Sequence, residues 1–334
     1  MTKPSDTSRR DFLKTFLVGA AALGASGTLA HAEEPAAKSR VVLARDGNVF
    51  GADGALDHGR TLNLLDRAME AMYELSDPVA AWKKVIRPGE RVSLKVNVLG
   101  GKGLRSNPML VDAICERLQG AGVRARDIIV WDRDTDELER TGFRVSDDPN
   151  KVRILGTDRF GFEDEHSTHG SVASRLSKIL TRECDVMINV PVLKDHEGAG
   201  VTVALKNMYG VIHNPNKMHP NNCNPYIADL NMLPEVRGKM RLTICDATTA
   251  GYEGGPGYKP QFAWKANSIL VSRDPVALDY SAWQIIERKR AEKGLKSLEA
   301  EKRAPIHIVT AADAQHRLGT NDPNRINVVE VVAG

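Results

Sequence analysis

Apolar segments of two different periods alternate along the chain. Apolar residues at helical spacing predict helices over residues 61–75, 107–119, 171–181, 230–236, 274–290 and 311–318. Shorter apolar runs predict strands over residues 41–44, 91–98, 127–131, 152–155, 185–191, 240–245, 269–272, 305–309 and 326–331. This alternation predicts an α/β protein with a mostly parallel sheet, helices on both faces and a single large domain with loop insertions. The acidic, Arg- and Gly-rich stretch 132–170 is interpreted as an insertion or a lid.

The N-terminal pattern is typical of an export signal. Arg9 and Arg10 precede a short, Gly- and Ala-rich apolar run, which ends at the cleavage-type sequence Ala30-His31-Ala32. The arginine pair predicts a twin-arginine signal peptide over 1–32, the twin-arginine translocase as a partner during export, and a periplasmic location. An N-terminal membrane anchor is the alternative, but the run is short and weakly apolar. Residues 33–39 are expected to form a flexible leader before the α/β domain at 40–334.

Charge and cysteine spacing exclude several functions. The whole chain carries a net charge of +3, and residues 1–32 carry +2 of it, so the remainder is nearly neutral. No basic domain remains to bind nucleic acid, and no second apolar stretch predicts a stable membrane span after cleavage. The four cysteines form no C-x-x-C pair, which argues against an iron–sulfur cluster or a zinc ribbon.

Polar side chains follow two of the predicted central strands. Lys95 and Asn97 project to one side of their strand, near its carboxyl end, where ligands bind in parallel sheets. Lys194 and His196 follow the strand that ends at Pro191. A lysine can hold an anion or act as a base, and a histidine can relay protons or bind a metal. The alternatives are an edge strand with one solvated face and an exposed polar loop.

Lys206 and Asn207 lie in a helix that is predicted to begin near Gly200. Gly198 and Gly200 leave backbone N–H groups uncovered, which suggests an anion cradle at the start of the helix. The alternative is that Lys206 extends along the helix surface to reach solvent.

A loop rich in Asn and Pro carries His213, His219 and Cys223. Together with His196, the two histidines are candidate metal ligands, so a metal ion is one candidate cofactor. The spacing matches no standard zinc pattern, and contacts to an anion or a solvated loop are the alternatives.

A further strand end carries Asp246, and the following loop is rich in glycine. Gly254 and Gly255 allow a tight turn and the close approach of a ligand. Asp246 or Glu253 is expected to supply a carboxylate that complements His196. The alternative is a flexible surface loop. The candidate catalytic residues are therefore His196, Lys194, Asp246 and Glu253, and the candidate cofactor-binding residues are Lys95, Asn97, Lys206, Asn207, Gly254 and Gly255.

These segments together resemble the domain-of-unknown-function family 362 (DUF 362). The resemblance rests on KVN at 95–97, NPMLVDAICERLQGAG at 107–122, NVPVLKDH at 189–196, GVTVALKNMYGVI at 200–212, DATTAGYEGGPG at 246–257 and SRDPVALD at 272–279. It implies a single α/β domain with a shared polar site, and it assigns no activity. Some relatives carry a ferredoxin-like cysteine module, which this chain lacks. The layout of strands and Lys/His loops is also loosely similar to nickel-dependent lactate racemase.

The resulting hypothesis is a periplasmic enzyme that acts on a small anionic ligand or holds an anionic or metal cofactor. Redox chemistry is the first reaction class to consider, on the export route and the family context rather than on residues. One alternative is a non-catalytic periplasmic protein that binds a ligand or cofactor or assists its assembly. The other is a racemase or isomerase resembling the nickel enzyme.

Overall fold

A computed structural model describes residues 38–334, which belong to one compact unit. The predicted signal peptide and most of the predicted leader lie outside the described residues. Ser39, the last residue of that leader, is the first residue of strand β1. No helix within 38–334 is both long and apolar enough to cross a bilayer.

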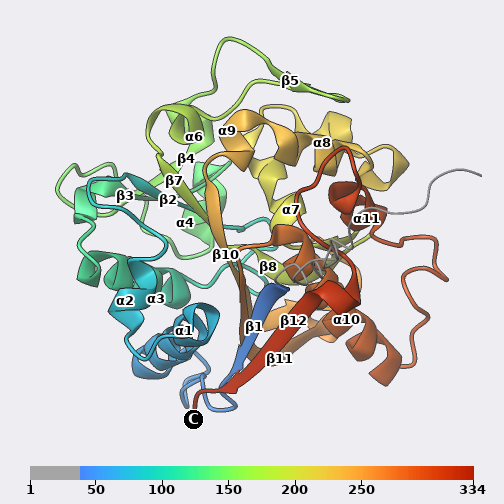
Figure 1. Cartoon of the computed structure of the whole chain (residues 1–334), viewed down its shortest axis with the longest axis horizontal. Helices are drawn as coiled ribbons and strands as arrows, with labels where there is room; N and C mark the ends of the chain where they lie inside the picture. Colours follow the sequence, from blue (N-terminus) through green and yellow to red (C-terminus); the bar gives the residue numbers. More distant parts are fainter. Residues whose placement is uncertain (1–37) are drawn as a thin grey trace, which may run out of the picture. The chain divides into compact units, whose positions relative to one another are not determined.

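The described chain contains a ten-stranded mixed sheet (Figure 1). Its main path runs β12-β1-β11-β10-β7-β2-β3-β4, and β8 joins through β10 and carries β9 on its other side. The bounds of these strands are β1 Ser39–Arg45, β2 Val92–Lys95, β3 Ile128–Asp132, β4 Arg153–Gly156, β7 Val186–Asn189, β8 Val192–His196, β9 Gly200–Thr202, β10 Met240–Gly251, β11 Ala263–Ser272 and β12 Ile326–Val332. A separate two-stranded sheet pairs β5 Ser167–His169 with β6 Val172–Ser174.

Parallel pairing predominates at the strands that carry the polar loops. β4, β3, β2, β7 and β10 are parallel neighbours, and β8 also runs parallel to β10. The antiparallel pairs of the main path are β1 with β11 and β10 with β11. Because parallel strands end at the same edge, the loops after β2, β3, β7 and β8 meet there. The prediction of a mostly parallel α/β sheet is confirmed.

The helices cover both faces of the sheet, as predicted. Val42 and Ala44 of β1 pack with the core that includes α1 and α3, whereas Val41 and Leu43 pack with the core that includes α8, α10 and α11. Figure 1 shows α1, α2 and α3 grouped on one side of the sheet and α7, α8, α10 and α11 on the other. The α-helices are α1 His58–Tyr73, α2 Pro78–Trp82, α3 Pro108–Gly120, α4 Thr135–Arg140, α5 Thr157–Phe160, α6 Lys178–Arg182, α7 Ala204–Asn207, α8 Tyr226–Met232, α9 Pro234–Arg237, α10 Pro275–Glu292 and α11 Ile306–Ala312.

Several predicted elements are wrong. The helix expected over 171–181 is divided between β6 and α6, and the strand expected over 305–309 is instead the start of α11. Periodicity alone does not distinguish such short apolar runs. The helix expected near Gly200 begins only at Ala204, because Gly200 belongs to β9. The stretch 132–170 is not a simple insertion, since it supplies β4 at the edge of the main sheet.

Candidate functional site

A cavity of about 320 Å³ lies at the carboxyl ends of the parallel strands. Its wall residues include Lys95 at the end of β2 and Asn97 after it, Asp132 of β3, His196 of β8, Lys206 and Asn207 of α7, and His219. We call it the strand-end cavity. Its volume is within the range of small-molecule sites, about 300–1,000 Å³.

Lys95 is paired with a carboxylate. Its Nζ donates to Oδ1 of Asp132 at 2.7 Å and to the carbonyl of Val96 at 2.7 Å. The other oxygen of Asp132 accepts from the backbone N–H of Val98 at 2.9 Å. The pair therefore ties the end of β2 to the end of β3, and the positive charge of Lys95 is largely neutralised inside the protein.

Three asparagines connect the strand ends to α7. Nδ2 of Asn97 donates to Oδ1 of Asn207 at 3.0 Å, and Nδ2 of Asn207 donates to Oδ1 of Asn189 at 2.7 Å. Nζ of Lys194 donates to Oδ1 of Asn97 at 2.9 Å. Amides suit this position because each one can donate and accept at once. The network fixes α7 against β2 and β7.

Lys194 is fully buried and has no ion-pair partner within 38–334. Burial lowers the pKa of Lys194 to about 8; the nearby charge of Asp132 raises it, and the charge of Lys206 lowers it further. Its hydrogen bond to Asn97 places Lys194 behind the wall of the cavity, where its charge acts on the site through the amide.

Lys206 reaches the cavity directly. Its side chain is 6% exposed, and its Nζ lies 3.5 Å from Nε2 of His219 and 4.0 Å from the ring centre of Tyr209. No carboxylate forms an ion pair with it among residues 38–334. Burial lowers the pKa of Lys206 to about 8. Its ammonium is therefore a cation-π partner of Tyr209 whose charge an acid does not neutralise.

The short helix α7 is held at its start by an acid. Both oxygens of Asp279 accept backbone N–H groups, from Ala204 at 2.6 Å and from Leu205 at 3.1 Å. Burial raises the pKa of Asp279 to about 7, against the effect of these two hydrogen bonds. Asp279 thereby positions the helix turn that carries Lys206 and Asn207.

His196 is fixed as a neutral ring. Its Nδ1 accepts backbone N–H groups from Gly198 at 3.0 Å and from Ala199 at 3.1 Å. Burial, with the charges of Lys206 and His219, lowers the pKa of His196 to about 2. Because Nδ1 is an acceptor in this geometry, the proton of the neutral ring sits on Nε2. The arrangement favours a hydrogen-bond donor over the acid or base role that the sequence predicts.

The structure brings together two of the three predicted metal ligands. The rings of His196 and His219 are stacked with their centres 5.9 Å apart. The ring of His213 instead packs edge-on against Phe162, at 5.1 Å, and does not contribute to the cavity wall. No group of three or more His, Cys, Asp or Glu side chains in the described part of the chain is placed to hold a metal ion. Metal binding by this set stays a prediction.

Asp246 and Glu253 have other partners. Asp246 is buried and accepts from the backbone N–H of Asn107 at 2.7 Å and from the hydroxyl of Thr248 at 2.7 Å. Glu253 binds Arg290 and lies 2.5 Å from Nη2 of Arg303. Neither acid is part of the cavity wall. Both acids therefore have structural roles. Asp246 holds the start of α3, and Glu253 belongs to a cluster of ion pairs with two arginines.

The glycine loop packs against β8. The backbone N–H of Gly255 donates to Oδ1 of Asp195 at 2.9 Å, and a Cβ on Gly255 would lie 2.2 Å from the carbonyl oxygen of Asp195. Gly254 has a φ of 72°, which an L side chain rarely adopts. The close approach predicted for these glycines is therefore made to the protein's own strand, and Pro256 is the loop residue in the cavity wall.

Sequence reasoning missed three residues of this network: Asp132, Asn189 and Tyr209. Asp132 carried the same signal as Asp246, an acid that closes an apolar strand. Asn189 ends β7 in the same way. Tyr209 gave no signal, because its position beneath Lys206 depends on the turn from α7 into the 3-10 helix at Met208–Val211.

The fold and the strand-end site define an α/β protein with a polar cavity at the edge of a parallel sheet segment. The chain belongs to the family described as Domain of unknown function (DUF362), whose family model matches residues 92–284. That range includes the whole polar network. The chain is also 28% identical over 270 residues to a thylakoid-associated protein of Synechocystis sp., an alignment that covers 76% of this chain and 75% of that protein.

Proposed function

We propose that this protein is an enzyme that binds a small anion in the strand-end cavity and moves a proton through Lys206. The supporting observation is the buried ammonium of Lys206, which lies in the cavity wall without an ion-paired carboxylate among residues 38–334. Burying a cation without a counter-charge lowers the stability of the folded protein, and a bound anionic ligand would offset that loss.

The charged side chains around the strand-end cavity would hold a bound ligand in one orientation. The cations Lys95, Lys194 and Lys206 come from β2, β8 and α7. Asp134 and Glu137 line the side toward α4, and the pKa of Glu137 is raised by burial and by neighbouring acids. An anionic group would therefore sit toward Lys206 and the Nε2–H of His196, with the rest of the ligand toward α4.

Lys206 suits proton transfer because its pKa, about 8, is close to neutral pH. Neutral amine and ammonium would both be populated near pH 8, so one group could accept a proton from the ligand and return it. The neutral His196 would hold the ligand by a hydrogen bond without taking its proton. Redox chemistry is the reaction class that we place first, on the export signal and the family context.

The test begins with protein purified from its own host, analysed by native mass spectrometry and elemental analysis for a bound organic mass or metal. Any ligand found is then incubated with the protein in D2O. The proposal expects exchange of a ligand hydrogen at carbon with deuterium, with at least tenfold slower exchange in Lys206→Met and unchanged exchange in Lys102→Met. A ligand that is retained without exchange or turnover would instead identify a non-catalytic carrier.

Export by the twin-arginine route is a separate part of the proposal. It rests on Arg9, Arg10 and the Ala30-His31-Ala32 sequence. The double substitution of Arg9 and Arg10 by lysine should leave the full-length chain in the cytoplasm, whereas the wild-type chain should appear in the periplasm shortened after Ala32. If the variant and the wild-type chain are found in the same cell compartment with the same length, the twin-arginine route is contradicted.

A further inference from the structure

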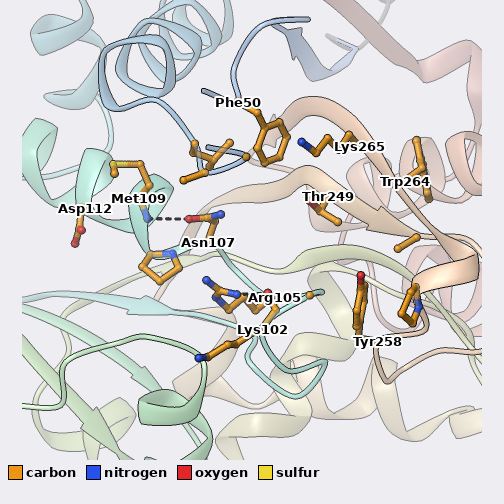
Figure 2. Close-up of a pocket in the computed structure, with 17 residues that line it drawn as sticks. Phe50, Lys102, Arg105, Asn107, Met109, Asp112, Thr249, Tyr258, Trp264 and Lys265 are labelled. Atoms are coloured by element: carbon orange, nitrogen blue, oxygen red, sulfur yellow. Dashed lines mark hydrogen bonds between the residues drawn. The ribbon is translucent and has the colours of Figure 1, made fainter. Parts of the chain in front are cut away.

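A second cavity, separate from the strand-end cavity, measures about 570 Å³ (Figure 2). Its walls come from the loop after β2, the start of α3, the segment between β1 and α1, and the ends of β10 and β11. It shares no wall residue with the strand-end cavity. We call it the aromatic cleft, and its ligand is independent of the function proposed above.

The charge of the aromatic cleft is predominantly positive. Lys102, Arg105 and Lys265 contribute to its walls, and Asp112 is the acid among its wall residues. None of the three cations forms an ion pair within the described residues 38–334. The pKa of Asp112 is raised by burial, so its opposing charge is weakened further. An anion entering this cleft would find three cations without an ion pair among residues 38–334, of which Arg105 also feels the charge of the buried Asp246.

Among the wall residues, Arg105 gives the strongest indication of an anionic ligand. Its Nη1 is bound to the carbonyl of Lys102, while its Nε is buried and has no hydrogen-bond partner among residues 38–334. Buried polar groups are nearly always hydrogen-bonded, so the described residues leave the donors of this guanidinium incompletely satisfied. The planar guanidinium matches the two oxygens of a carboxylate or phosphate.

Aromatic side chains provide the remaining walls. The rings of Phe50 and Tyr258 line the cleft, and Tyr258 is 43% exposed, whereas the ring of Trp264 packs against Tyr252 on the other face of β11. Gly103 allows the ring of Tyr258 to lie against the loop backbone, because a Cβ there would be 2.4 Å from that ring. Nζ of Lys265 lies 4.1 Å from the ring centre of Phe50. In Figure 2, Phe50 and Lys265 lie at one end of the view and Arg105, Lys102 and Tyr258 at the other, with Thr249 between them.

We propose that the aromatic cleft binds a planar aromatic molecule that carries a carboxylate or phosphate group. The acid group would pair with Arg105 and Lys102, and the ring would pack against Tyr258 or Phe50. The volume fits a ligand of more than one ring, since small-molecule pockets span about 300–1,000 Å³.

The test uses three probes with one ring system: 1-naphthoate, 1-naphthyl phosphate and the neutral 1-naphthol, titrated into the full chain by calorimetry. One anionic probe should bind with 1:1 stoichiometry and at least tenfold more tightly than 1-naphthol. Whichever anion binds better identifies the acid group of the ligand. Arg105→Gln should weaken that binding at least tenfold, and Lys102→Gln, a change at an exposed side chain, at least threefold.

Two controls locate the probe. Lys206→Met, in the strand-end cavity, should leave the affinity unchanged. Tyr258→Ala, which removes an exposed ring of the cleft, should weaken the binding of the anionic probe at least threefold. The proposal is overturned if neither anion binds, if 1-naphthol binds equally well, if Arg105→Gln and Lys102→Gln bind like the wild type, or if Lys206→Met loses the binding.

Discussion

Nζ of Lys206 lies 3.5 Å from Nε2 of His219, a nitrogen that is free to accept because Nδ1 of the same ring lies 3.1 Å from the carbonyl oxygen of Pro215. The histidine therefore presents a lone pair to the lysine rather than a second positive charge. The pKa of His219 is lowered by burial and by Lys206, which keeps the ring neutral. Lys206 thus has no carboxylate partner among residues 38–334, while the side chain of Cys223 lies beside it and raises its pKa against the effect of burial.

The first prediction concerns the stability cost of this charge. The pKa of Lys206 in the folded protein, about 8, is below its ordinary value of 10.5. The folded state then binds fewer protons than the unfolded state between these values, so stability rises with pH across this window. In Lys206→Met the free energy of unfolding should rise less with pH, because the variant has no ammonium group to lose a proton. At pH 7 it should be more stable than the wild type by up to about 3 kcal/mol, since one pKa unit corresponds to about 1.4 kcal/mol.

Urea denaturation at pH 7, 9 and 10.5 measures this difference, with the exposed Lys102→Met as the matched control. The advantage of Lys206→Met should shrink as the pH rises, and Lys102→Met should follow the wild type. If Lys206→Met is less stable than the wild type at pH 7, other groups of the folded protein already stabilise the ammonium charge of Lys206, and the prediction is wrong.

The second prediction concerns the acid that positions α7. The pKa of Asp279, about 7, is above its ordinary value of 3.8, so the folded state binds more protons than the unfolded state between these values. Stability should therefore fall as the pH rises from about 4 to 7, by up to about 4 kcal/mol from this group. Asp279→Asn should show a flatter profile in urea denaturation across that range, and the exposed Asp53→Asn should keep the wild-type slope. Equal slopes for Asp279→Asn and the wild type would refute the assignment.

The third prediction separates structure from chemistry at Glu253. This acid binds Arg290 and Arg303, and the side chain of Arg290 is fully buried. Glu253→Gln should lower the free energy of unfolding by about 2 kcal/mol, because it weakens hydrogen bonds to charged groups. It should leave ligand turnover per folded molecule unchanged within twofold. Loss of turnover at unchanged stability would instead support the catalytic role that the sequence predicts.

The fourth prediction uses two glycines of one loop. A Cβ on Gly255 would lie 2.2 Å from the carbonyl oxygen of Asp195, whereas a Cβ on Gly257 would meet no atom within 4 Å. Gly255→Ala should lower stability by about 1–3 kcal/mol through overpacking, and Gly257→Ala should change it by less than about 0.5 kcal/mol. Thermal denaturation of both variants compares them directly, and equal midpoints would show that the loop does not pack tightly on β8.

The sequence predicted the class of fold and six residues that meet in space: Lys95, Asn97, Lys194, His196, Lys206 and Asn207. This succeeded because polar residues at the ends of apolar parallel strands converge at one edge of the sheet. It did not predict that Asp246 and Glu253 are engaged by backbone and arginine partners, because those partners lie far away in the chain. Nor could it predict the cleft around Arg105, whose walls come from four separate stretches of the chain.

For His196 the sequence predicts the position of the side chain but not its protonation state. Its position at a strand end was readable from the sequence, but its protonation depends on two backbone N–H groups that reach Nδ1 from the following turn. A residue type indicates which chemistry is available, and the local hydrogen bonds decide which form of the side chain is present.

Isothermal titration of acetate, lactate, oxalate and inorganic phosphate tests the central claim most directly. At pH 7 at least one of these anions should bind the wild-type chain with 1:1 stoichiometry. Its affinity should fall at least tenfold at pH 10, where Lys206 has lost its proton, and at least tenfold at pH 7 in Lys206→Met. Lys102→Met, in the aromatic cleft, should bind as the wild type does. Equal binding by Lys206→Met and the wild type, or no binding by either, would contradict the account.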